Sequence, residues 1–168
     1  MNNRKFYTCC FTGHRPNKLP WKYNEKGLKY LLFFFKLKKI INRAIKQGYI
    51  YFISGMALGA DMVFSQIVIN LKKKNSNIKL ECAIPCANQT EKWTAKDIKK
   101  YNNILNLADK ITYVSKRRYF KGCMQQRNKY MVDNSNLLLA VYNNGFGGTF
   151  QTIQYAKANN LKIKIIKP

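Results

Sequence analysis

Acidic residues are scarce in this chain. Only seven of its 168 residues are Asp or Glu, against 31 Lys and Arg, so the formal net charge is +24. The seven acids are Glu25, Asp61, Glu81, Glu91, Asp97, Asp109 and Asp133. Chemistry that needs a carboxylate therefore has few candidates, and a cluster of several carboxylates is disfavoured.

Metal-ligating residues are also few. The chain has one histidine, His14, and its five cysteines are Cys9, Cys10, Cys82, Cys86 and Cys123. Most of these cysteines lie in apolar runs, and no second pair of Cys or His stands at the spacing typical of zinc sites. We therefore predict reduced thiols in the core, no metal site and no required cofactor.

Long hydrophobic segments are missing as well. No apolar run approaches the length needed to cross a bilayer, and the first residues, MNNRKFYTCCFTG, lack the apolar region of a secretion signal. We expect a cytoplasmic protein without membrane contact. With 46% hydrophobic residues over 168 positions, the chain is long enough for one core, so we predict a single domain over residues 1–168.

The positive charge has two interpretations. Lys and Arg neutralise phosphates, which favours nucleic-acid binding. However, the lysines are scattered over every segment with one run, KKK at 72–74, and scattered lysine is typical of a solvated surface. The chain is also rich in Asn, Ile and Tyr, which AT-rich codons specify. We favour general basicity and keep weak, non-specific nucleic-acid binding as the alternative.

What the chain does have is a regular alternation of apolar runs and helix-like segments. The runs typical of strands cover residues 5–12, 49–54, 78–85, 111–114, 136–142 and 162–166. Segments with helical periodicity lie between them, at 30–48, 58–74, 94–107, 123–133 and 149–159. This alternation predicts an α/β fold: a doubly wound, mostly parallel sheet of about six strands with helices on both faces.

The apolar patterns also suggest a strand order. A strand covered on both faces reads as a continuous apolar run, whereas an edge strand tolerates alternation. The third and sixth strands alternate. We therefore expect the order 3-2-1-4-5-6, with the first and fourth strands at the centre and the binding crevice at their carboxyl ends.

Two glycine-rich loops follow predicted strands, SGMALGAD at 54–61 and NNGFGGT at 143–149. Glycine lets the backbone approach a phosphate, and the N–H groups that begin the next helix attract an anion. Neither loop fits the P-loop or the G-x-G-x-x-G pattern. Together, the loops at this edge supply the candidate ligand-binding residues Gly13, His14, Arg15, Ser54, Gly55, Met56, Gly59, Asp61, Pro85, Trp93, Arg127, Asn128, Asn143, Gly145, Gly147, Gly148 and Thr149.

Four of these candidates have specific chemistry. Arg15 and Arg127 offer a bidentate fork to a phosphate, which scattered lysines do not. His14 is a candidate general base or phosphate donor, because it titrates near neutral pH. Trp93 either stacks on a base or packs in the core or a lid.

Two acids are further catalytic candidates, alongside Arg127 and His14. Asp61 could orient a ribose hydroxyl or a loop amide, or it could simply lie favourably at a helix N-terminus. Asp133 could pair with Arg127 or cap a turn. The residues leave these alternatives open.

Several motifs together resemble the SLOG superfamily, in particular its YpsA-like branch. They are FTGHRP, KLPW, SGMALGAD, AIPC, GCMQQRNKYMVD and GGT, in that order, and the resemblance runs from about residue 9 to the C-terminus. It implies a Rossmann-like fold and a site for nucleotides or nucleotide-derived ligands, NAD-derived or nucleic-acid-derived ones included. SLOG domains are associated with sensing or binding such ligands, often in bacterial and phage conflict systems.

Two related families sharpen this expectation. SGMALGAD is similar to the glycine loop of the DNA-processing protein A family, which helps to bind the backbone of single-stranded DNA. The segment from 124 to 149 is similar to the signature of the LOG phosphoribohydrolases, matched at Met124, Arg127, Met131 and Thr149.

The segment departs from the LOG signature at three places. Asn128 replaces a lysine, Thr152 stands in the place of the catalytic glutamate, and the longer glycine loop carries Phe146. Because glycosidic cleavage builds positive charge that a carboxylate stabilises, a threonine weakens the enzyme interpretation.

We therefore expect a sensor or sequestering module for a nucleotide-type ligand. A LOG-type nucleotide N-glycosidase is the first alternative, and single-stranded nucleic-acid binding is the second. The aromatic-rich segment YLLFFFKL, from residue 30, is either an ordinary core helix or the interface of a homo-oligomer, as in LOG-like relatives.

Overall fold

A computed structural model describes residues 3–168; Met1 and Asn2, the first residues of the N-terminal segment in which no secretion signal is expected, lie outside them. Its strands are β1 (Thr8–Thr12), β2 (Tyr51–Ser54), β3 (Lys79–Ile84), β4 (Lys110–Tyr113), β5 (Leu137–Val141) and β6 (Lys162–Ile166). The α-helices are α1 (Leu28–Lys46), α2 (Ala60–Lys72), α3 (Ala95–Leu107), α4 (Cys123–Asp133) and α5 (Gly148–Ala158), and the short 3-10 helices are η1 (Asn3–Tyr7) and η2 (Pro16–Lys18). Residues 5–7, expected at the start of the first strand, belong to η1 instead.

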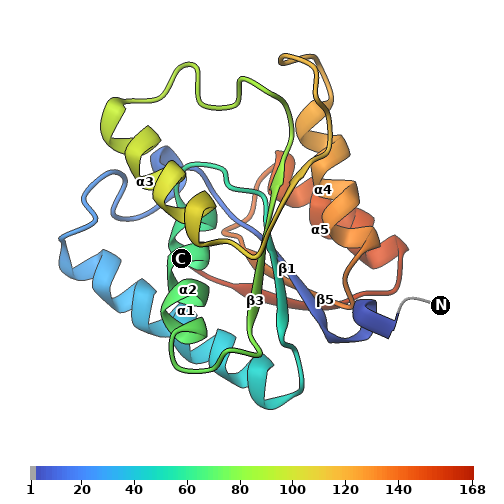
Figure 1. Ribbon diagram of the computed structural model, residues 1–168. Coiled ribbons are helices and arrows are strands. Elements are labelled where there is room, and N and C mark those ends of the chain that lie inside the picture. Colours follow the sequence, from blue (N-terminus) through green and yellow to red (C-terminus); the bar gives the residue numbers. More distant parts are fainter. Residues whose placement is uncertain (1–2) are drawn as a thin grey trace.

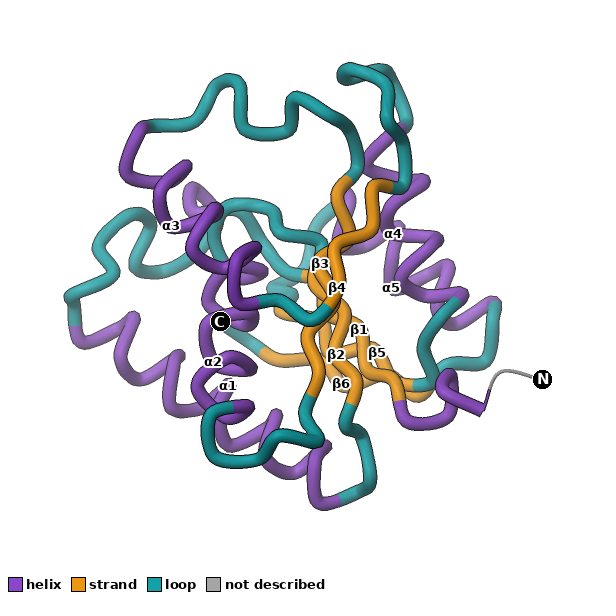
Figure 2. Tube along the Cα trace, in the orientation of Figure 1, coloured by secondary structure: helices purple, strands orange, loops and turns teal. Residues whose placement is uncertain are grey.

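The strands form one parallel sheet with helices on both faces, which confirms the predicted Rossmann-like fold class. Figures 1 and 2 show α1, α2 and α3 on one side of the sheet and α4 and α5 on the other. Successive side chains of a central strand point to opposite faces of the sheet. In β1, Phe11 packs with the core of the α1–α3 side, and its neighbour Cys10 packs with the core of the other side. All five cysteines are buried and free.

The strand order is β4-β3-β2-β1-β5-β6, so the expected order 3-2-1-4-5-6 is wrong. The fourth strand lies at the edge beside β3, and β5 takes the place beside β1. β4 is short and mostly exposed, as an edge strand should be. The alternation in the third strand has another cause, which is a buried acid.

That acid is Glu81 in β3, whose side chain is fully buried. Its carboxylate accepts hydrogen bonds from the hydroxyls of Tyr51 at 2.6 Å, Thr112 at 2.7 Å and Tyr130 at 2.5 Å, and Lys110 Nζ lies 3.4 Å away. Burial raises the pKa of Glu81, but the hydrogen bonds and Lys110 outweigh burial and hold that pKa below its ordinary value. The charged residue in the sequence of β3 therefore belongs to an internal polar cluster and does not indicate an edge strand.

Helix α1 buries the face that its periodicity predicts. Phe33, Leu37, Ile41 and Ala44 are buried against the core. The opposite face carries exposed apolar side chains at Leu28, Leu31, Leu32 and Phe35. Such a face is compatible with an oligomer, which stays a prediction. Across residues 3–168, none of the helices combines the length and the apolar character that a membrane span requires.

The Glu81 cluster gives a test of stability. Glu81→Gln should lower the free energy of unfolding at pH 7 by about 1 to 3 kcal/mol, because an amide cannot accept all three hydroxyl bonds. Tyr130→Phe, which removes one bond, should cost about 1 kcal/mol. Because the folded pKa of Glu81 lies below its ordinary value of 4.5, its contribution is present above that value and is lost as the pH falls through the folded pKa. Urea unfolding from pH 7 to pH 3 should therefore show the gap between wild type and Glu81→Gln narrowing; a constant gap would contradict this account.

Candidate ligand-binding site

A cavity of about 290 Å³ lies at the carboxyl ends of β1 and β5. The chain runs outward from β1 to β4 and then returns to place β5 on the other side of β1, so this is the point where the strand order reverses. The lining residues are Thr12, Gly13, His14, Arg15, Asn17, Lys18, Ala57, Asp61, Met124, Arg127, Asn128, Tyr142, Gly145, Phe146, Gly147, Gly148, Thr149 and Phe150. Ten of the seventeen predicted ligand-binding residues are among them.

The N-terminus of α5 opens into this cavity. Gly147 precedes the helix and Gly148 begins it, and no side chain caps this end. The first N–H groups of an α-helix have no acceptor within the helix, so they are available to a ligand. A Cβ added to Gly148 would meet no atom of the described residues within 4 Å, which leaves the approach to these groups open.

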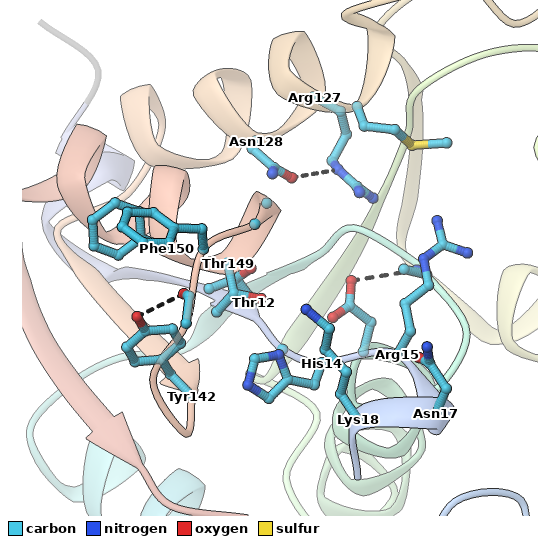
Figure 3. Close-up of a pocket in the computed structure, with 18 residues that line it drawn as sticks. Thr12, His14, Arg15, Asn17, Lys18, Arg127, Asn128, Tyr142, Thr149 and Phe150 are labelled. Atoms are coloured by element: carbon cyan, nitrogen blue, oxygen red, sulfur yellow. Dashed lines mark hydrogen bonds between the residues drawn. The ribbon is translucent and has the colours of Figure 1, made fainter.

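Arg127 lines the same cavity from α4 (Figure 3). Its guanidinium is buried, and two contacts fix it: Nη1 donates to the carbonyl oxygen of Gly55, and Nε donates to Oδ1 of Asn128 at 2.9 Å. Burial lowers the pKa of Arg127, and the charge of Asp61 works in the other direction. Since a guanidinium has five N–H donors, several remain for a ligand. Asn128 therefore orients the arginine in this chain.

Arg127 also explains why residue 55 is glycine. A Cβ on Gly55 would overlap Nη1 of Arg127 and would lie 2.5 Å from its Cζ. The carbonyl and the guanidinium can meet only because that side chain is missing. Gly59 has a similar constraint, since its φ is +95° and a Cβ there would lie 2.7 Å from the carbonyl oxygen of His14.

The loop SGMALGAD has a supporting role, and three of its backbone amides already donate hydrogen bonds within the protein. Met56 N–H donates to Oγ of Ser54 at 3.2 Å, Ala57 N–H to Oδ2 of Asp61 at 3.3 Å, and Ala60 N–H to the carbonyl oxygen of His14 at 3.2 Å. Ser54, Gly55, Met56 and Gly59 do not line the cavity, contrary to our expectation of a second anion cradle. Met56 itself has a φ of +55°, a conformation unusual for a residue with a side chain. The loop positions Arg127 and Asp61.

Asp61 is the one carboxylate among the residues that line the cavity. It is buried, and burial raises the pKa of Asp61 to about 6, although the charges of Arg127 and Arg15 lower it. Asp133 lies elsewhere: it is exposed near the end of α4 and accepts a hydrogen bond from the hydroxyl of Tyr155 at 2.9 Å. Of the two roles left open for Asp133, a pairing with Arg127 is not among the contacts of the described residues.

His14 joins two loops. Its Nε2 accepts a hydrogen bond from the backbone N–H of Asn143 at 3.1 Å, which leaves the proton on Nδ1. The pKa of His14 lies below its ordinary value, chiefly because of burial and also because of the charge of Lys18. Nε2 is thus engaged and does not act as a free base, while the ring still lines the cavity. Asn143 contributes through its backbone and is not itself a lining residue.

Thr152, which stands in the place of the catalytic glutamate of the LOG signature, does not line the cavity. Its hydroxyl donates to the carbonyl oxygen of Gly148 at 2.8 Å, one turn earlier in α5, and the residue is buried outside the lining. Thr149, three residues earlier, does line the cavity. Pro85 is buried and lies outside the lining, and Trp93 belongs to an adjoining cavity.

The sequence reasoning missed an aromatic wall. The rings of Tyr142 and Phe150 lie 6.4 Å apart, and those of Phe146 and Phe150 lie 5.4 Å apart. Figure 3 shows Tyr142 and Phe150 on the side of the cavity opposite Arg15. The available signal was the residue type, because aromatic rings in and beside the glycine loop offer a stacking surface. Thr12, Asn17, Lys18 and Ala57 were also missed, and nothing in their residue types marks them.

Comparison with known proteins gives one family. A family model described as YspA SLOG family, with the short name YpsA, matches residues 9–168. The uncharacterized SPbeta prophage-derived protein YoqJ of Bacillus subtilis is 36% identical, over 75% of this chain and 81% of that protein. A UPF0398 protein of Halalkalibacterium halodurans is 31% identical, over 78% of this chain and 69% of the relative.

Two solved structures have a similar fold. DNA processing protein A (DprA) from Streptococcus pneumoniae superimposes with a TM-score of 0.66 at 15% identity, over 98% of this chain and 52% of that one. DNA processing protein A from Helicobacter pylori, whose structure concerns its single-stranded DNA binding mode, gives a TM-score of 0.62 at 15% identity, over 94% of this chain and 64% of that one. The chain thus spans about half to two thirds of these proteins, and the likeness establishes the fold.

The contact between Gly55 and Arg127 can be tested by adding one methyl group. Gly55→Ala should lower the free energy of unfolding by about 1 to 3 kcal/mol, because the new Cβ must displace a buried guanidinium. Gly148→Ala is the matched control, since its methyl group enters open space at a helix start, and stability should change by less than about 0.5 kcal/mol. Urea unfolding of both variants makes the comparison. Equal stability in the two would remove Gly55 as a packing constraint.

Proposed function

The chain belongs to the YpsA SLOG family, and on this premise we propose that it binds a nucleotide or nucleotide-derived phosphorylated ligand between β1 and β5, as a sensor or sequestering module. One observation carries the proposal: the buried Arg127 and the uncapped N-terminus of α5 line the same cavity. A charge is costly to bury, and an anion between these two groups would be bound by both.

The charges around the cavity support a phosphate as the bound group. Arg15 and Lys18 line it from the loop after β1, and Arg127 lines it from α4. Asp61 is the opposing charge, and with a pKa of about 6 it takes up a proton readily when an anion approaches. The balance of charge therefore favours an anionic ligand.

The aromatic wall supports a base attached to that phosphate. Phe146 is 88% exposed in the glycine loop and packs edge-on against Phe150 at the cavity. An exposed aromatic ring beside an anion site offers a stacking surface for a nucleobase. A nucleotide satisfies both halves of the site.

Hydrolysis is a weaker candidate. Asp61, the one lining carboxylate, already accepts the N–H of Ala57, and Thr152 lies outside the lining. A carboxylate that must stabilise developing positive charge on a ribose needs to face it freely. We therefore place binding ahead of N-glycosidase activity.

Single-stranded nucleic-acid binding is the second candidate. The similar fold of the Helicobacter pylori protein, whose structure concerns single-stranded DNA binding, and the net charge of +24 favour it. Binding through scattered lysines would lack sequence preference and would fall steeply with salt. Binding of a ligand in the cavity would depend instead on the few residues that line it.

Gly148→Asp should abolish binding of nucleoside monophosphates, because the new carboxylate occupies the place of the anion while favouring the helix start. Gly148→Ala should bind at close to wild-type affinity. Calorimetric titration, with mass spectrometry of the small molecules that copurify, measures both. The bound nucleotide should be recovered intact; release of free base that is lost in Arg127→Ala would favour the hydrolase instead. Unchanged affinity in Gly148→Asp would remove α5 from the site.

Arg15→Ala should weaken nucleotide binding by about 1.5 to 3 kcal/mol, the range for a hydrogen bond to a charged group. Lys157→Ala, an exposed charge near the other end of α5, is the matched control and should have almost no effect. Both variants are compared by titration at physiological salt. Equal losses would point to a diffuse electrostatic surface and would favour nucleic-acid binding.

A further inference from the structure

A second cavity adjoins the first. It has a volume of about 530 Å³, and Arg15 and Met124 line both cavities. The first cavity is built mainly from the loops after β1 and β5 and from α4, whereas the second is built from the loops after β3 and β4. Figure 1 shows the connections from β3 to α3 and from β4 to α4 at the same end of the sheet. The two cavities thus form one continuous surface.

The wall of the second cavity is held by specific contacts. The side chain of Asn88 ties the two loops together, because its Oδ1 accepts the N–H of Tyr119 at 2.6 Å and its Nδ2 donates to Glu91 at 2.6 Å. Glu91 in turn pairs with Arg118. Ala87 N–H donates to the carbonyl oxygen of Arg117 at 2.9 Å. These bonds hold the cavity open in a defined shape.

The lining has the chemistry of a base-binding subsite. Trp93 and Tyr119 supply aromatic surface, and Tyr119 is 63% exposed. Gln89 also lines the cavity; its Nε2 donates to the carbonyl oxygen of Met56 at 2.9 Å, which fixes the amide. Its Oε1 is buried and accepts no hydrogen bond from the described residues. The rings of Trp93 and Tyr119 therefore offer a stacking surface for a base.

The size of the cavities bears on the ligand. Sites for small molecules usually enclose about 300 to 1,000 Å³, so the first cavity, at the low end of this range, suits a mononucleotide better than a larger compound. The second cavity is the larger of the two and has no role in binding a mononucleotide. Arg15, at the boundary, can bind a phosphate that bridges them.

We propose that the ligand consists of two nucleosides joined through phosphate, with the linking phosphate between Arg15 and Arg127 and the second base in the cavity of Trp93 and Tyr119. This inference rests on the proposed function, because it assumes that the first cavity binds a nucleotide. The shared chemistry is that of a dinucleotide, whether it is a free molecule or two successive units of a single strand.

Titration with mononucleotides and dinucleotides tests this. The probes are 5′-phosphorylated homodinucleotides of each base, the matching monophosphates, NAD, and a long single-stranded oligodeoxyadenylate. Wild type should bind one of the two-nucleoside probes at least about tenfold more tightly than its monophosphate, as expected when a further base is stacked. Tighter binding of the free dinucleotide or NAD than of the oligonucleotide identifies a small-molecule ligand, and the reverse identifies a strand.

Tyr119→Ala and Trp93→Leu should remove this advantage and leave monophosphate affinity unchanged. Trp93 packs against Tyr101, with ring centroids 5.4 Å apart, whereas exposed Tyr119 can be replaced without loss of folding. The matched control is Tyr7→Ala, a half-exposed tyrosine at the amino end of β1, which should change neither affinity. Equal affinity of wild type for monophosphates and all two-nucleoside probes would overturn this inference alone, as would variants without effect. Failure of every probe to bind would overturn the proposed function itself.

Discussion

The buried charge of Arg127 is the constraint on which the site depends. An ionised guanidinium away from water needs hydrogen bonds and opposite charge around it. The carbonyl of Gly55 and the side chain of Asn128 supply the bonds, and Asp61 supplies the charge. In the loop after β2, the amide of Ala57 donates to Asp61, and the carbonyl oxygen of Gly55 accepts from the arginine. One charge thus accounts for the glycine at position 55, the conformation of the loop after β2 and part of the cavity wall.

The fold could be predicted from the sequence because a strand that is buried on both faces of the sheet has few charged residues. Charged residues are missing from Thr8–Thr12 and Leu137–Val141, every residue of both runs is buried, and both are internal strands of the sheet. The strand order was not accessible in the same way. Glu81 gives β3 the alternation of an edge strand, although its charge is satisfied inside the protein by three hydroxyls. A sequence shows that a residue is charged and does not show where its partners are.

The candidate site likewise contains residues that the sequence indicated and residues that it did not. Arg127, His14 and the glycines before α5 could be named in advance, because their chemistry or their lack of a side chain is visible in the sequence. The two glycine loops could not be told apart, since what distinguishes them is the destination of their N–H groups. Thr12 and Ala57 line the cavity only by position, and their residue types carry no signal.

The helix end at Gly148 offers main-chain N–H groups to the cavity, without a side-chain cap. Main-chain amides are the same in every amino acid except proline, so this half of the site does not depend on composition. Arg15, Lys18 and Arg127 are the basic side chains that line the cavity, out of the 31 Lys and Arg in the chain. The remaining basic residues lie outside that lining, so a change in the overall lysine content of the chain would leave the chemistry of the cavity wall unaltered.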